Sequence, residues 1–559
     1  MRALLAILAT TTLAAAGLAT TGAADAAPSA TTAPTDYVVL ASSADGAATA
    51  AKAVTDAGGT VTSTNDSLGY VTARSTSGSF TTDVARAKGV VGAARNRVIG
   101  EAPDARAKAD AVEKAVGRSG AAKAKPVKNA EPLAGLQWDM KQIDATVNGS
   151  YAKQPGKKGV LVGIIDTGVD GTHPDIAPNF DAKLSRNFTT DIPDIDDIDG
   201  ACEHPESGCK DPANEDDDGH GTHVASTIGS PINGLGIAGV APKVTLVNIR
   251  AGQDSGYFFL QPTLDALTYA GKIGVDVVNM SYYTDPWLYN CTANPADSPA
   301  EQAEQKVIIQ ATQRALNFAR NRGVLPVAAE GNEATDLGNP TFDDTSPDYP
   351  VDAPKERTVD NSCLNVPAES KGVVTVSATG PSTRKSYYSN YGTEQTDVAA
   401  PGGDTYDNPE KTRQLAGAVL AAMPANVAEA EGVLNPDGTP NTPAVVQSCK
   451  GSGAKQVCGY YQYLQGTSMA SPHAVGVAAL IVSQYGHGGG KNIGLSPSVT
   501  ESILLGTATE HACPTPRTYH YVRNLPDGTV STADATCEGP KSDNGFYGQG
   551  IVNALRAVS

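Results

Sequence analysis

Five short apolar runs are spaced along the chain from residue 160 onward. They are continuous and do not alternate with polar residues, which is typical of strands buried on both faces of a parallel sheet. The runs are Val160–Ile165, Val244–Ile249, Val275–Met280, Val324–Ala329 and Val373–Ala378. Between them, Leu260–Tyr269 and Glu301–Arg322 repeat apolar residues with a helical period. Alternating strands and helices predict an α/β fold of three layers around a mainly parallel central sheet, over residues 131–559.

A shorter unit with its own hydrophobic pattern precedes this domain, over residues 36–101. Strand-like and helix-like patterns follow one another in it. The predicted elements are a strand at Tyr37–Leu40, a helix at Ala47–Ala57, strands starting at Thr60 and Tyr70, a helix at Ser79–Ala87 and a strand at Val90–Val98. This order of strands and helices (βαββαβ) predicts a small α+β domain of the ferredoxin-like type.

Residues 102–130 separate the two domains and differ from both in composition. They are rich in alanine, lysine and arginine and contain almost no bulky apolar residue. Such a stretch cannot form a core of its own and is easily cut by proteases. We therefore predict an exposed basic linker, with a maturation cut between about Ala102 and Glu131.

The first 26 residues have the pattern of a secretory signal peptide. Arg2 supplies a positive charge, and Ala3–Leu18 is apolar and rich in alanine. Small residues at positions 24–26 allow cleavage before Ala27. A membrane anchor needs about 20 clearly apolar residues, whereas three threonines (Thr10–Thr12) interrupt this stretch. The predicted product is secreted and extracellular, and no membrane partner is expected.

The overall charge of the chain argues against two classes of partner. The 559 residues carry a net charge of −18, with a pI near 4.9. An acidic surface repels phosphate backbones and anionic lipids, so nucleic acid and membrane surfaces are not expected as partners. Repulsion between acidic copies also favours a soluble monomer.

Eight cysteines follow residue 200, and none precedes it. An even number of cysteines behind an export signal predicts disulfides, although eight cysteines allow 105 pairings. Short loops favour three pairs, and the remaining two cysteines then form the fourth. The predicted pairs are Cys202–Cys209, Cys449–Cys458, Cys513–Cys537 and Cys291–Cys363. No CxxC pattern indicates a zinc site.

Three glycine-containing segments each present one reactive side chain. Asp166 follows the first apolar run and precedes a Thr-Gly turn, His220 lies between two glycines, and Ser468 follows a Gly-Thr pair. Acyl transfer uses these three residue types, because a carboxylate orients an imidazole, the imidazole accepts a proton, and the hydroxyl attacks. The small residues after Ser468 predict a helix that passes through the core, with Ser468 at its N-terminus.

Other histidines lie near these segments. His223 comes three residues after His220, but the H-E-x-x-H spacing of zinc peptidases is absent. We interpret His220 as the base and His223 as a buried helix residue. His173 and His473 are also interpreted as structural.

Together these segments resemble the subtilisin-type serine proteases, the subtilases. The matching strings are Ile165–Gly168, His220–Ala225, Gly331-Asn332, Gly466–His473 and Gly548–Ala554. The chain order Asp, His, Ser agrees with that family. The resemblance covers the chain from about Gln137 to the end. The N-terminal unit also resembles the family's propeptide, which is a folding chaperone and inhibitor.

The resemblance implies a role for each matched side chain. Ser468 is the implied nucleophile, His220 the general acid and base, and Asp166 the partner that orients His220. Asn332 matches the asparagine whose amide stabilises the oxyanion together with the Ser468 backbone N–H. This chemistry requires no cofactor.

The implied substrate cleft departs from the family pattern in places. The strand that ends at Ser281 matches the edge strand on which the family pairs an extended peptide. Tyr282 and Tyr283 replace small residues there, and the bulk of Tyr283 is expected to narrow the primary pocket. Glu330 is unusual before Gly331. Its carboxylate either lies in the pocket and favours a basic side chain, or points away and is bonded in the core.

A structural Ca²⁺ site is a further hypothesis from the resemblance. Asp175 matches a calcium-binding aspartate of many subtilases, and Asn233 lies in Pro231–Ile237, which matches the calcium loop. Carboxylate, amide and carbonyl oxygens are suitable ligands for Ca²⁺. The glutamine that completes the family's site is not evident at its N-terminal position.

The sequence thus predicts a secreted serine endopeptidase, made as an inactive precursor, that hydrolyses polypeptide substrates through an acyl-enzyme. Its own propeptide is the second expected partner. Two alternatives stay open. A peptide ligase or macrocyclase would pass the acyl group to an amine, and a non-catalytic binder would carry the site as a relic.

Overall fold

The structure is a computed structural model that describes residues 34–97, 127–192, 202–348, 354–489 and 492–559. The predicted signal peptide (1–26) and nearly all of the predicted linker (102–130) lie outside the described residues.

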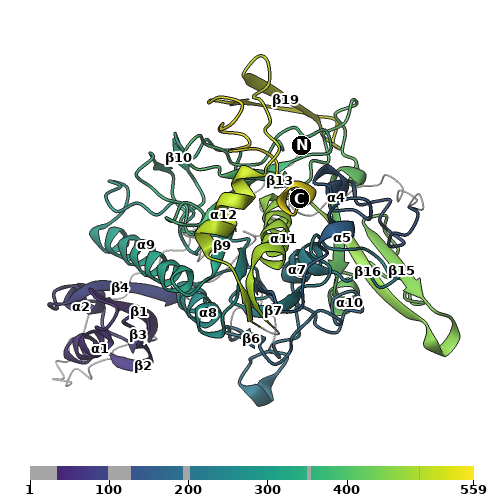
Figure 1. Ribbon diagram of the computed structural model, residues 1–559. Helices are drawn as coiled ribbons and strands as arrows, with labels where there is room; N and C mark the ends of the chain where they lie inside the picture. The colour runs from purple at the N-terminus through teal and green to yellow at the C-terminus, as the bar shows by residue number, and fades with distance from the viewer. Residues whose placement is uncertain (1–33, 98–126, 193–201, 349–353, 490–491) are drawn as a thin grey trace, which may run out of the picture.

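A seven-stranded parallel sheet forms the centre of the large domain (Figure 1). Its strand order is β13-β12-β9-β8-β5-β7-β6, and each pair of neighbours runs parallel. The strands are β5 (Leu161–Ile165), β6 (Arg186–Asn187), β7 (Thr245–Arg250), β8 (Val277–Met280), β9 (Leu325–Ala329), β12 (Val374–Thr379) and β13 (Val398–Pro401). The five apolar runs coincide with β5, β7, β8, β9 and β12, whereas the short strand β6 and the edge strand β13 were not predicted.

Alternate residues of the strands face opposite sides of the sheet and create two cores. Val162 and Ile164 of β5 pack in the core that contains α7 and α11. Leu161 and Ile165 pack in the other core, with α8 and α9. These helices are α7 (His220–Gly229), α8 (Leu260–Ile273), α9 (Pro299–Arg320) and α11 (Thr467–Tyr485). The predicted three-layer α/β fold is confirmed.

Helix α11 runs through the core and not along the surface. All its residues from Thr467 to Ser483 are buried. At Gly476 an added Cβ would lie 2.4 Å from the Cβ of Val240. The small residues that follow Ser468 in the sequence therefore permit close packing around the helix that carries this serine.

Residues 35–97 form a second sheet with two helices, in the order expected from the sequence. The sheet is antiparallel, with strand order β2-β3-β1-β4. The elements are β1 (Thr35–Ala41), α1 (Ala47–Asp56), β2 (Thr60–Asn65), β3 (Tyr70–Ser75), α2 (Phe80–Ala85) and β4 (Val90–Arg97). In Figure 1 this N-terminal unit, in purple, lies beside α8 and α9.

Polar contacts attach the N-terminal unit to α8 and α9. Arg95 of β4 forms an ion pair with the buried Glu304 of α9, with Nη2 2.7 Å from Oε2. The backbone N–H of Arg95 also donates to Glu304. Tyr70 donates its hydroxyl to Asp265 of α8 at 2.5 Å. Arg314 of α9 donates to backbone carbonyl oxygens of the unit.

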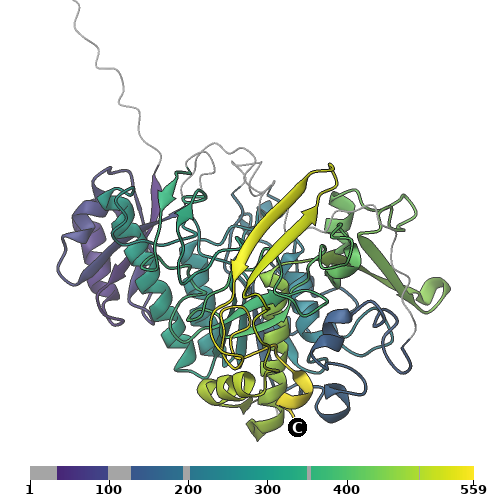
Figure 2. The same cartoon turned by 90° about the horizontal axis from the view of Figure 1, so that it is seen from above.

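Several further elements lacked a clear hydrophobic period in the sequence. Strands β14, β16 and β15 form a small antiparallel sheet, and β19 and β20 form a hairpin, seen as the long yellow ribbon in Figure 2. The remaining elements are α4 (Trp138–Gln142), α5 (Ser150–Lys153), β10 (Phe342–Asp343), β11 (Arg357–Thr358), β14 (Val419–Met423), α10 (Ala425–Ala430), β15 (Val445–Lys450), β16 (Val457–Leu464), β17 (His487–Gly489), β18 (Asn492–Gly494), α12 (Pro497–Gly506), β19 (Thr518–Asn524), β20 (Val530–Thr536), α13 (Ala554–Ala557) and three 3₁₀ turns (Pro205–Ser207, Leu415–Gly417 and Gly453–Lys455).

The eight cysteines form four disulfides, and the pairs are those predicted from loop length. They are Cys202–Cys209, Cys291–Cys363, Cys449–Cys458 and Cys513–Cys537. The Cys449–Cys458 bond joins β15 to β16, and the Cys513–Cys537 bond closes the base of the β19–β20 hairpin.

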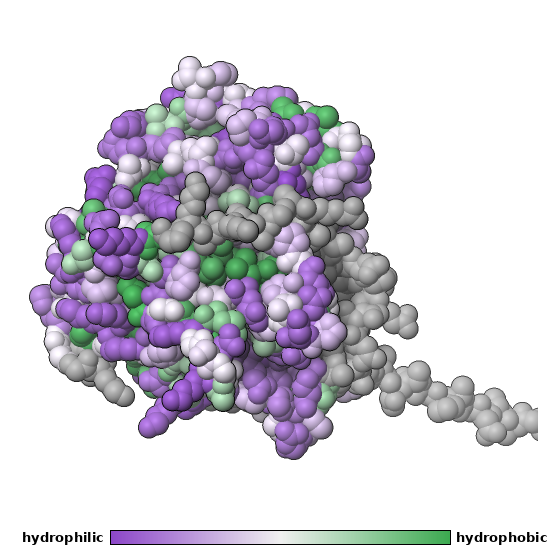
Figure 3. Space-filling view, turned by 90° about the vertical axis from the view of Figure 1, so that its right-hand side faces the viewer, coloured by the Kyte–Doolittle hydropathy of each residue, from purple (hydrophilic) through white to green (hydrophobic). Residues whose placement is uncertain are grey.

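The surface is mostly hydrophilic on the face drawn in Figure 3, with small hydrophobic areas. Among the residues that the structure describes, no helix has both the length and the apolar character required to cross a bilayer.

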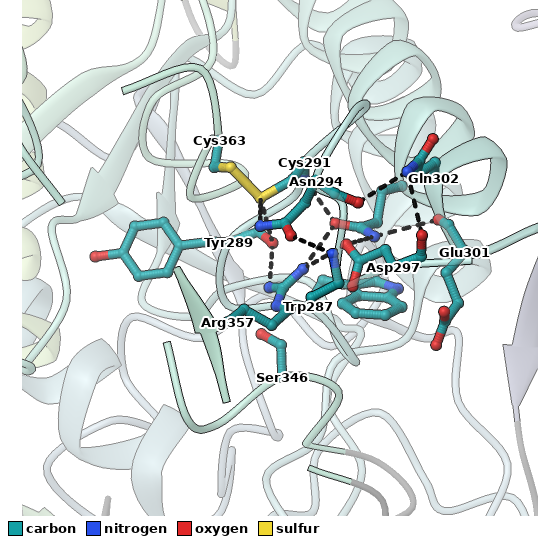
Figure 4. Close-up of polar contacts among 12 residues, drawn as sticks. Trp287, Tyr289, Cys291, Asn294, Asp297, Glu301, Gln302, Ser346, Arg357 and Cys363 are labelled. Carbon is teal, nitrogen blue, oxygen red and sulfur yellow. Dashed lines mark hydrogen bonds and ion pairs between the residues drawn. A yellow bond between two sulfur atoms is a disulfide. The ribbon is translucent and has the colours of Figure 1, made fainter. Parts of the chain in front are cut away.

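A buried polar cluster lies beside the Cys291–Cys363 disulfide (Figure 4). Its centre is Arg357, whose side chain is fully buried. The guanidinium forms ion pairs with Asp297 at 2.8 Å and with Asp343 at 2.5 Å. This cluster ties the segment after β8 to the start of α9.

Candidate active site

Asp166 and His220 lie in direct contact at the end of strand β5 of the central sheet. His220 Nδ1 is 2.7 Å from Asp166 Oδ1. The Asp166 side chain is fully buried and the His220 side chain is 14% exposed. The same carboxylate oxygen accepts the N–H of Thr167 at 2.8 Å. An ionised carboxylate at this position makes Nδ1 the protonated nitrogen of a neutral His220, so Nε2 is left as the basic atom.

Asp216 accepts hydrogen bonds from both of the segments that carry Asp166 and His220. Its Oδ1 accepts hydrogen bonds from the Thr167 hydroxyl (3.1 Å) and from Gly219 N–H (3.0 Å). Its Oδ2 accepts from the N–H and the hydroxyl of Thr222 on α7. Burial raises the pKa of Asp216 to about 6. Sequence analysis missed this residue, and the only signal was its place in the acidic run just before His220.

Ser468 lies in the first turn of α11 and is 5% exposed. Its backbone oxygen accepts the hydroxyl of Ser281, at the end of β8, at 3.1 Å. The Ser281 hydroxyl in turn accepts from the Asn279 amide at 2.8 Å. Helix α11 also packs against α7, which carries His220. The fold thus brings Ser281 at the end of β8, the Ser468 turn and the His220 helix into one region. Strand β8 is paired on both sides, so it is not the edge strand of the sheet that was expected from the sequence.

The side chain of Asn332 is hydrogen-bonded to Thr467, the residue that precedes Ser468. The N–H and the hydroxyl of Thr467 both donate to Asn332 Oδ1, each at 2.9 Å. The Thr467 hydroxyl accepts Gly331 N–H at 3.0 Å. Because the oxygen of the Asn332 amide is held in this way, its NH₂ group faces away from Thr467 and remains the donor end.

The three histidines interpreted as structural, His173, His223 and His473, are buried in the core. Burial lowers the pKa of His223 to about 3, and its Nε2 lies 3.2 Å from the backbone oxygen of Val419. Burial also lowers the pKa of His173. His473 lies between the backbone oxygen of Met469 and Asp139. These contacts agree with the interpretation of the three histidines as structural.

The two tyrosines after Ser281 differ in their surroundings. Tyr282 is buried and stacks on Phe258, with ring centroids 4.2 Å apart. Tyr283 is partly buried and donates its hydroxyl to Asp348 at 2.5 Å. Tyr282 therefore belongs to the core that contains α8 and α9, and the proposed effect of Tyr283 on the primary pocket stays a prediction.

The side chain of Glu330 lies in the core. Its exposed fraction is 0%, and its Oε1 accepts the hydroxyl of Thr396 at 2.6 Å. Burial raises the pKa of Glu330 well above its usual range, and the nearby Lys385 only partly offsets this. A carboxyl group that is buried in the core and bonded to Thr396 does not reach a substrate side chain. Of the two interpretations of Glu330, the arrangement fits the one bonded in the core.

We expect the Glu330→Gln variant to keep the wild-type preference at the residue before the scissile bond. Glutamine preserves the hydrogen bond with Thr396 and removes only a carboxyl group that faces the core. Cleavage of a peptide library by both proteins is the measurement. A variant that loses a preference for lysine or arginine at that position would place the carboxylate in the pocket.

The contacts of Asp175 and Asn233 do not fit the calcium site that the resemblance implied. Asp175 Oδ2 accepts from Ile237 N–H and from the Tyr461 hydroxyl, both at 3.0 Å. Asp175 Oδ1 accepts the Asn233 NH₂ group at 2.9 Å. The Asn233 amide oxygen accepts Leu235 N–H. The two side chains therefore bond to each other and to protein donors, and they do not direct oxygens toward a common ion.

A second acidic group contains Asp191, Asp211 and Asp254, with one carboxylate oxygen of each within 4.8 Å of the others. The buried guanidinium of Arg250 forms ion pairs with Asp211 and Asp254, each at 2.6 Å. These two carboxylates thus already have a protein cation.

Comparison with known proteins agrees with this fold. The profile of the subtilase family matches residues 157–550. Thermitase from Thermoactinomyces vulgaris is 27% identical over 374 residues, which cover 67% of this chain and 91% of thermitase. A thermophilic serine proteinase from Bacillus sp. (strain AK1) is 28% identical over 357 residues, which cover 63% of this chain and 59% of that protein's length.

A solved structure shares the fold at low sequence identity. The epidermin leader peptide processing serine protease (EpiP) from Staphylococcus aureus has a TM-score of 0.58 at 22% identity, over 94% of this chain and 98% of EpiP. The matched profile, which spans well over half of the chain, and the α/β fold define a serine-type peptidase. The chain belongs to the subtilase family.

Proposed function

We propose that this protein is a secreted serine endopeptidase whose triad is Asp166, His220 and Ser468. The observation that carries the proposal is the 2.7 Å contact between Asp166 and His220 Nδ1. It supports a neutral imidazole whose Nε2 is the basic nitrogen that accepts the proton of the Ser468 hydroxyl. The serine oxygen then attacks the substrate carbonyl, and water later releases the acyl-enzyme.

Asn332 is the proposed side-chain donor to the oxyanion. The two hydrogen bonds from Thr467 to Asn332 Oδ1 support this role, because they fix the oxygen end of the amide and direct the NH₂ group, the donor end, away from Thr467. The backbone N–H of Ser468, in the first turn of α11, is the proposed second donor. Groups that are fixed before the reaction stabilise developing charge without reorganisation.

The N-terminal unit is the proposed propeptide of an inactive precursor. Its ion pair with Glu304 and its hydrogen bond to Asp265 support a role in holding α8 and α9 during folding. Four disulfides support an oxidising compartment, and the signal-like residues 1–26 support export. The proposed partners are polypeptide substrates and this propeptide, the proposed state is monomeric, and cutting within residues 102–130 is the proposed maturation step.

Labelling by a fluorophosphonate tests the proposed nucleophile. We expect the secreted, matured protein to be labelled at Ser468, as found by mass spectrometry of its peptides, and to cleave internal bonds of unstructured polypeptides. A matured protein that is never labelled would favour the non-catalytic binder. Digests with an added peptide that has a free N-terminal amine separate hydrolysis from ligation, because a ligase joins this amine to the acyl group released by Ser468, whereas a hydrolase transfers that group to water.

A further inference from the structure

Asn390 contacts the loop that carries Asn332, and none of the chemistry described above accounts for it. Its side chain is fully buried, with an exposed fraction of 0%. It lies between β12 and β13, about sixty residues after the loop in the sequence. The hydrogen bonds of its amide group all go to residues 330–335.

The amide of Asn390 uses its complete hydrogen-bonding capacity on this loop. Its Nδ2 donates to the backbone oxygen of Glu330 (3.1 Å) and to Glu333 Oε2 (2.5 Å). Its Oδ1 accepts from the N–H groups of Glu333 (3.1 Å) and Thr335 (2.9 Å). An amide has two donor hydrogens and two acceptor lone pairs, so each is engaged. No apolar side chain offers these bonds, and a carboxylate offers only the acceptors.

The backbone of Asn390 also contacts this loop, at Gly331. Its N–H donates to the Gly331 oxygen at 3.0 Å. Gly331 has φ +108°, and a Cβ added there would lie 2.4 Å from Asn390 Nδ2. A glycine is therefore required before Asn332 for two reasons, its left-handed backbone and the approach of the Asn390 amide.

We propose that Asn390 is a positioning residue that holds the 330–335 loop so that the Asn332 amide is aimed at the oxyanion. The inference rests on the proposed function. Thr467 holds the side-chain oxygen of Asn332 from one side, and Asn390 holds the backbone before and after Asn332 from the other. Both the direction of the amide and the place of its Cα are then fixed before substrate arrives.

The first test compares turnover with binding in Asn390→Ala. We expect kcat to fall about tenfold to a hundredfold, since a displacement near 1 Å has this cost, with KM within about twofold of wild type. Rates are taken per active site titrated with the fluorophosphonate, so that unfolded protein does not count. An unchanged kcat per active site would overturn the proposal.

Asn544 provides a matched control. It is also fully buried, and its amide also bonds backbone groups, donating to the carbonyl oxygens of His511 and Pro540 and accepting the N–H groups of Phe546 and Tyr547. We expect Asn544→Ala to lower the melting temperature as Asn390→Ala does, with kcat per active site unchanged. A similar loss of kcat in both variants would show that any buried asparagine matters, and would contradict a specific role.

A double variant tests whether Asn390 acts through Asn332. If it does, Asn332→Ala/Asn390→Ala has a kcat within about twofold of Asn332→Ala alone, because the donor to be positioned is already absent. Losses that multiply would overturn the proposal. If Asn332→Ala itself leaves kcat unchanged, the proposed oxyanion role fails, and this outcome is distinct from a failure of Asn390.

A reciprocal exchange covers the case in which Asn390→Ala does not fold. Asn390→Asp keeps the size and the acceptors of the side chain but sets a carboxylate against Glu333. The double variant Asn390→Asp/Glu333→Gln restores one donor and one acceptor across this contact. We expect it to recover at least about threefold of the kcat lost in Asn390→Asp, and no recovery would count against the proposal.

Discussion

Replacement of Ser468 by alanine is expected to lower kcat about 10⁶-fold, the loss recorded when the nucleophile of subtilisin is removed. The reaction then has no oxygen to form the acyl-enzyme, and the residual rate comes from binding and the oxyanion donors alone. The fold should persist, because the hydrogen bond between Ser281 and Ser468 uses the backbone oxygen of Ser468, which alanine retains. Turnover of a peptide substrate and the melting temperature are the two measurements.

Ser483→Ala is the matched control for this variant. Ser483 lies on the same helix, is fully buried, and donates its hydroxyl to the backbone oxygen of Ala479 at 2.7 Å. Its loss should change stability slightly and leave kcat near the wild-type value. If Ser468→Ala cleaved peptides at a rate close to wild type, the serine nucleophile would be the wrong assignment.

The same variant reports on maturation. A precursor that cuts its own linker will accumulate at full length when Ser468 is alanine, with the 35–97 unit still attached. Addition of a small amount of wild-type enzyme then separates cutting within one molecule from cutting by another. Normal maturation of the variant would mean that a different protease makes the cut.

Local sequence patterns were sufficient to predict the main strands of the central sheet and the segments that carry the three reactive side chains. Strands such as β5 are apolar on both faces, so their runs are visible without tertiary information, whereas the two-residue strand β6 has no such signal. The segments around Asp166, His220 and Ser468 were also visible, since tight turns and close helix packing there require small residues next to the reactive side chain.

The hydrogen bonds that hold the site residues in place could not be predicted, because they join residues far apart in the sequence. Thr467 meets Asn332 across 135 positions, and Asn390 meets Glu333 across 57. The direction of Glu330 depends on Thr396, and the contacts of Asp175 depend on Tyr461, 286 positions later. A motif identifies a residue type at a turn, but only the folded chain determines which donor meets which acceptor.

The buried cluster of Figure 4 leads to the largest expected effect on stability. We expect Arg357→Leu to lower the free energy of unfolding by about 3–5 kcal/mol, the usual cost of removing one partner from a buried ion pair. The substitution leaves Asp297 and Asp343 without the guanidinium that each contacts. It also removes a cation that lies 4.9 Å from the ring centroid of Trp287. Urea unfolding of the variant and of wild type measures the difference.

Two further variants separate the charge from the packing of Arg357. Arg322→Leu removes an exposed arginine at the end of α9 and should change the free energy of unfolding by less than about 1 kcal/mol. The triple variant Arg357→Leu/Asp297→Asn/Asp343→Asn removes Asp343, which is left without a cation, and Asp297, which keeps only the partly exposed Lys355 at 3.2 Å, so it should be more stable than Arg357→Leu alone if under-compensated buried charge is the cause. A triple variant that is less stable still would instead assign the loss to packing and to the hydrogen bonds that Asp297 and Asp343 make with other residues.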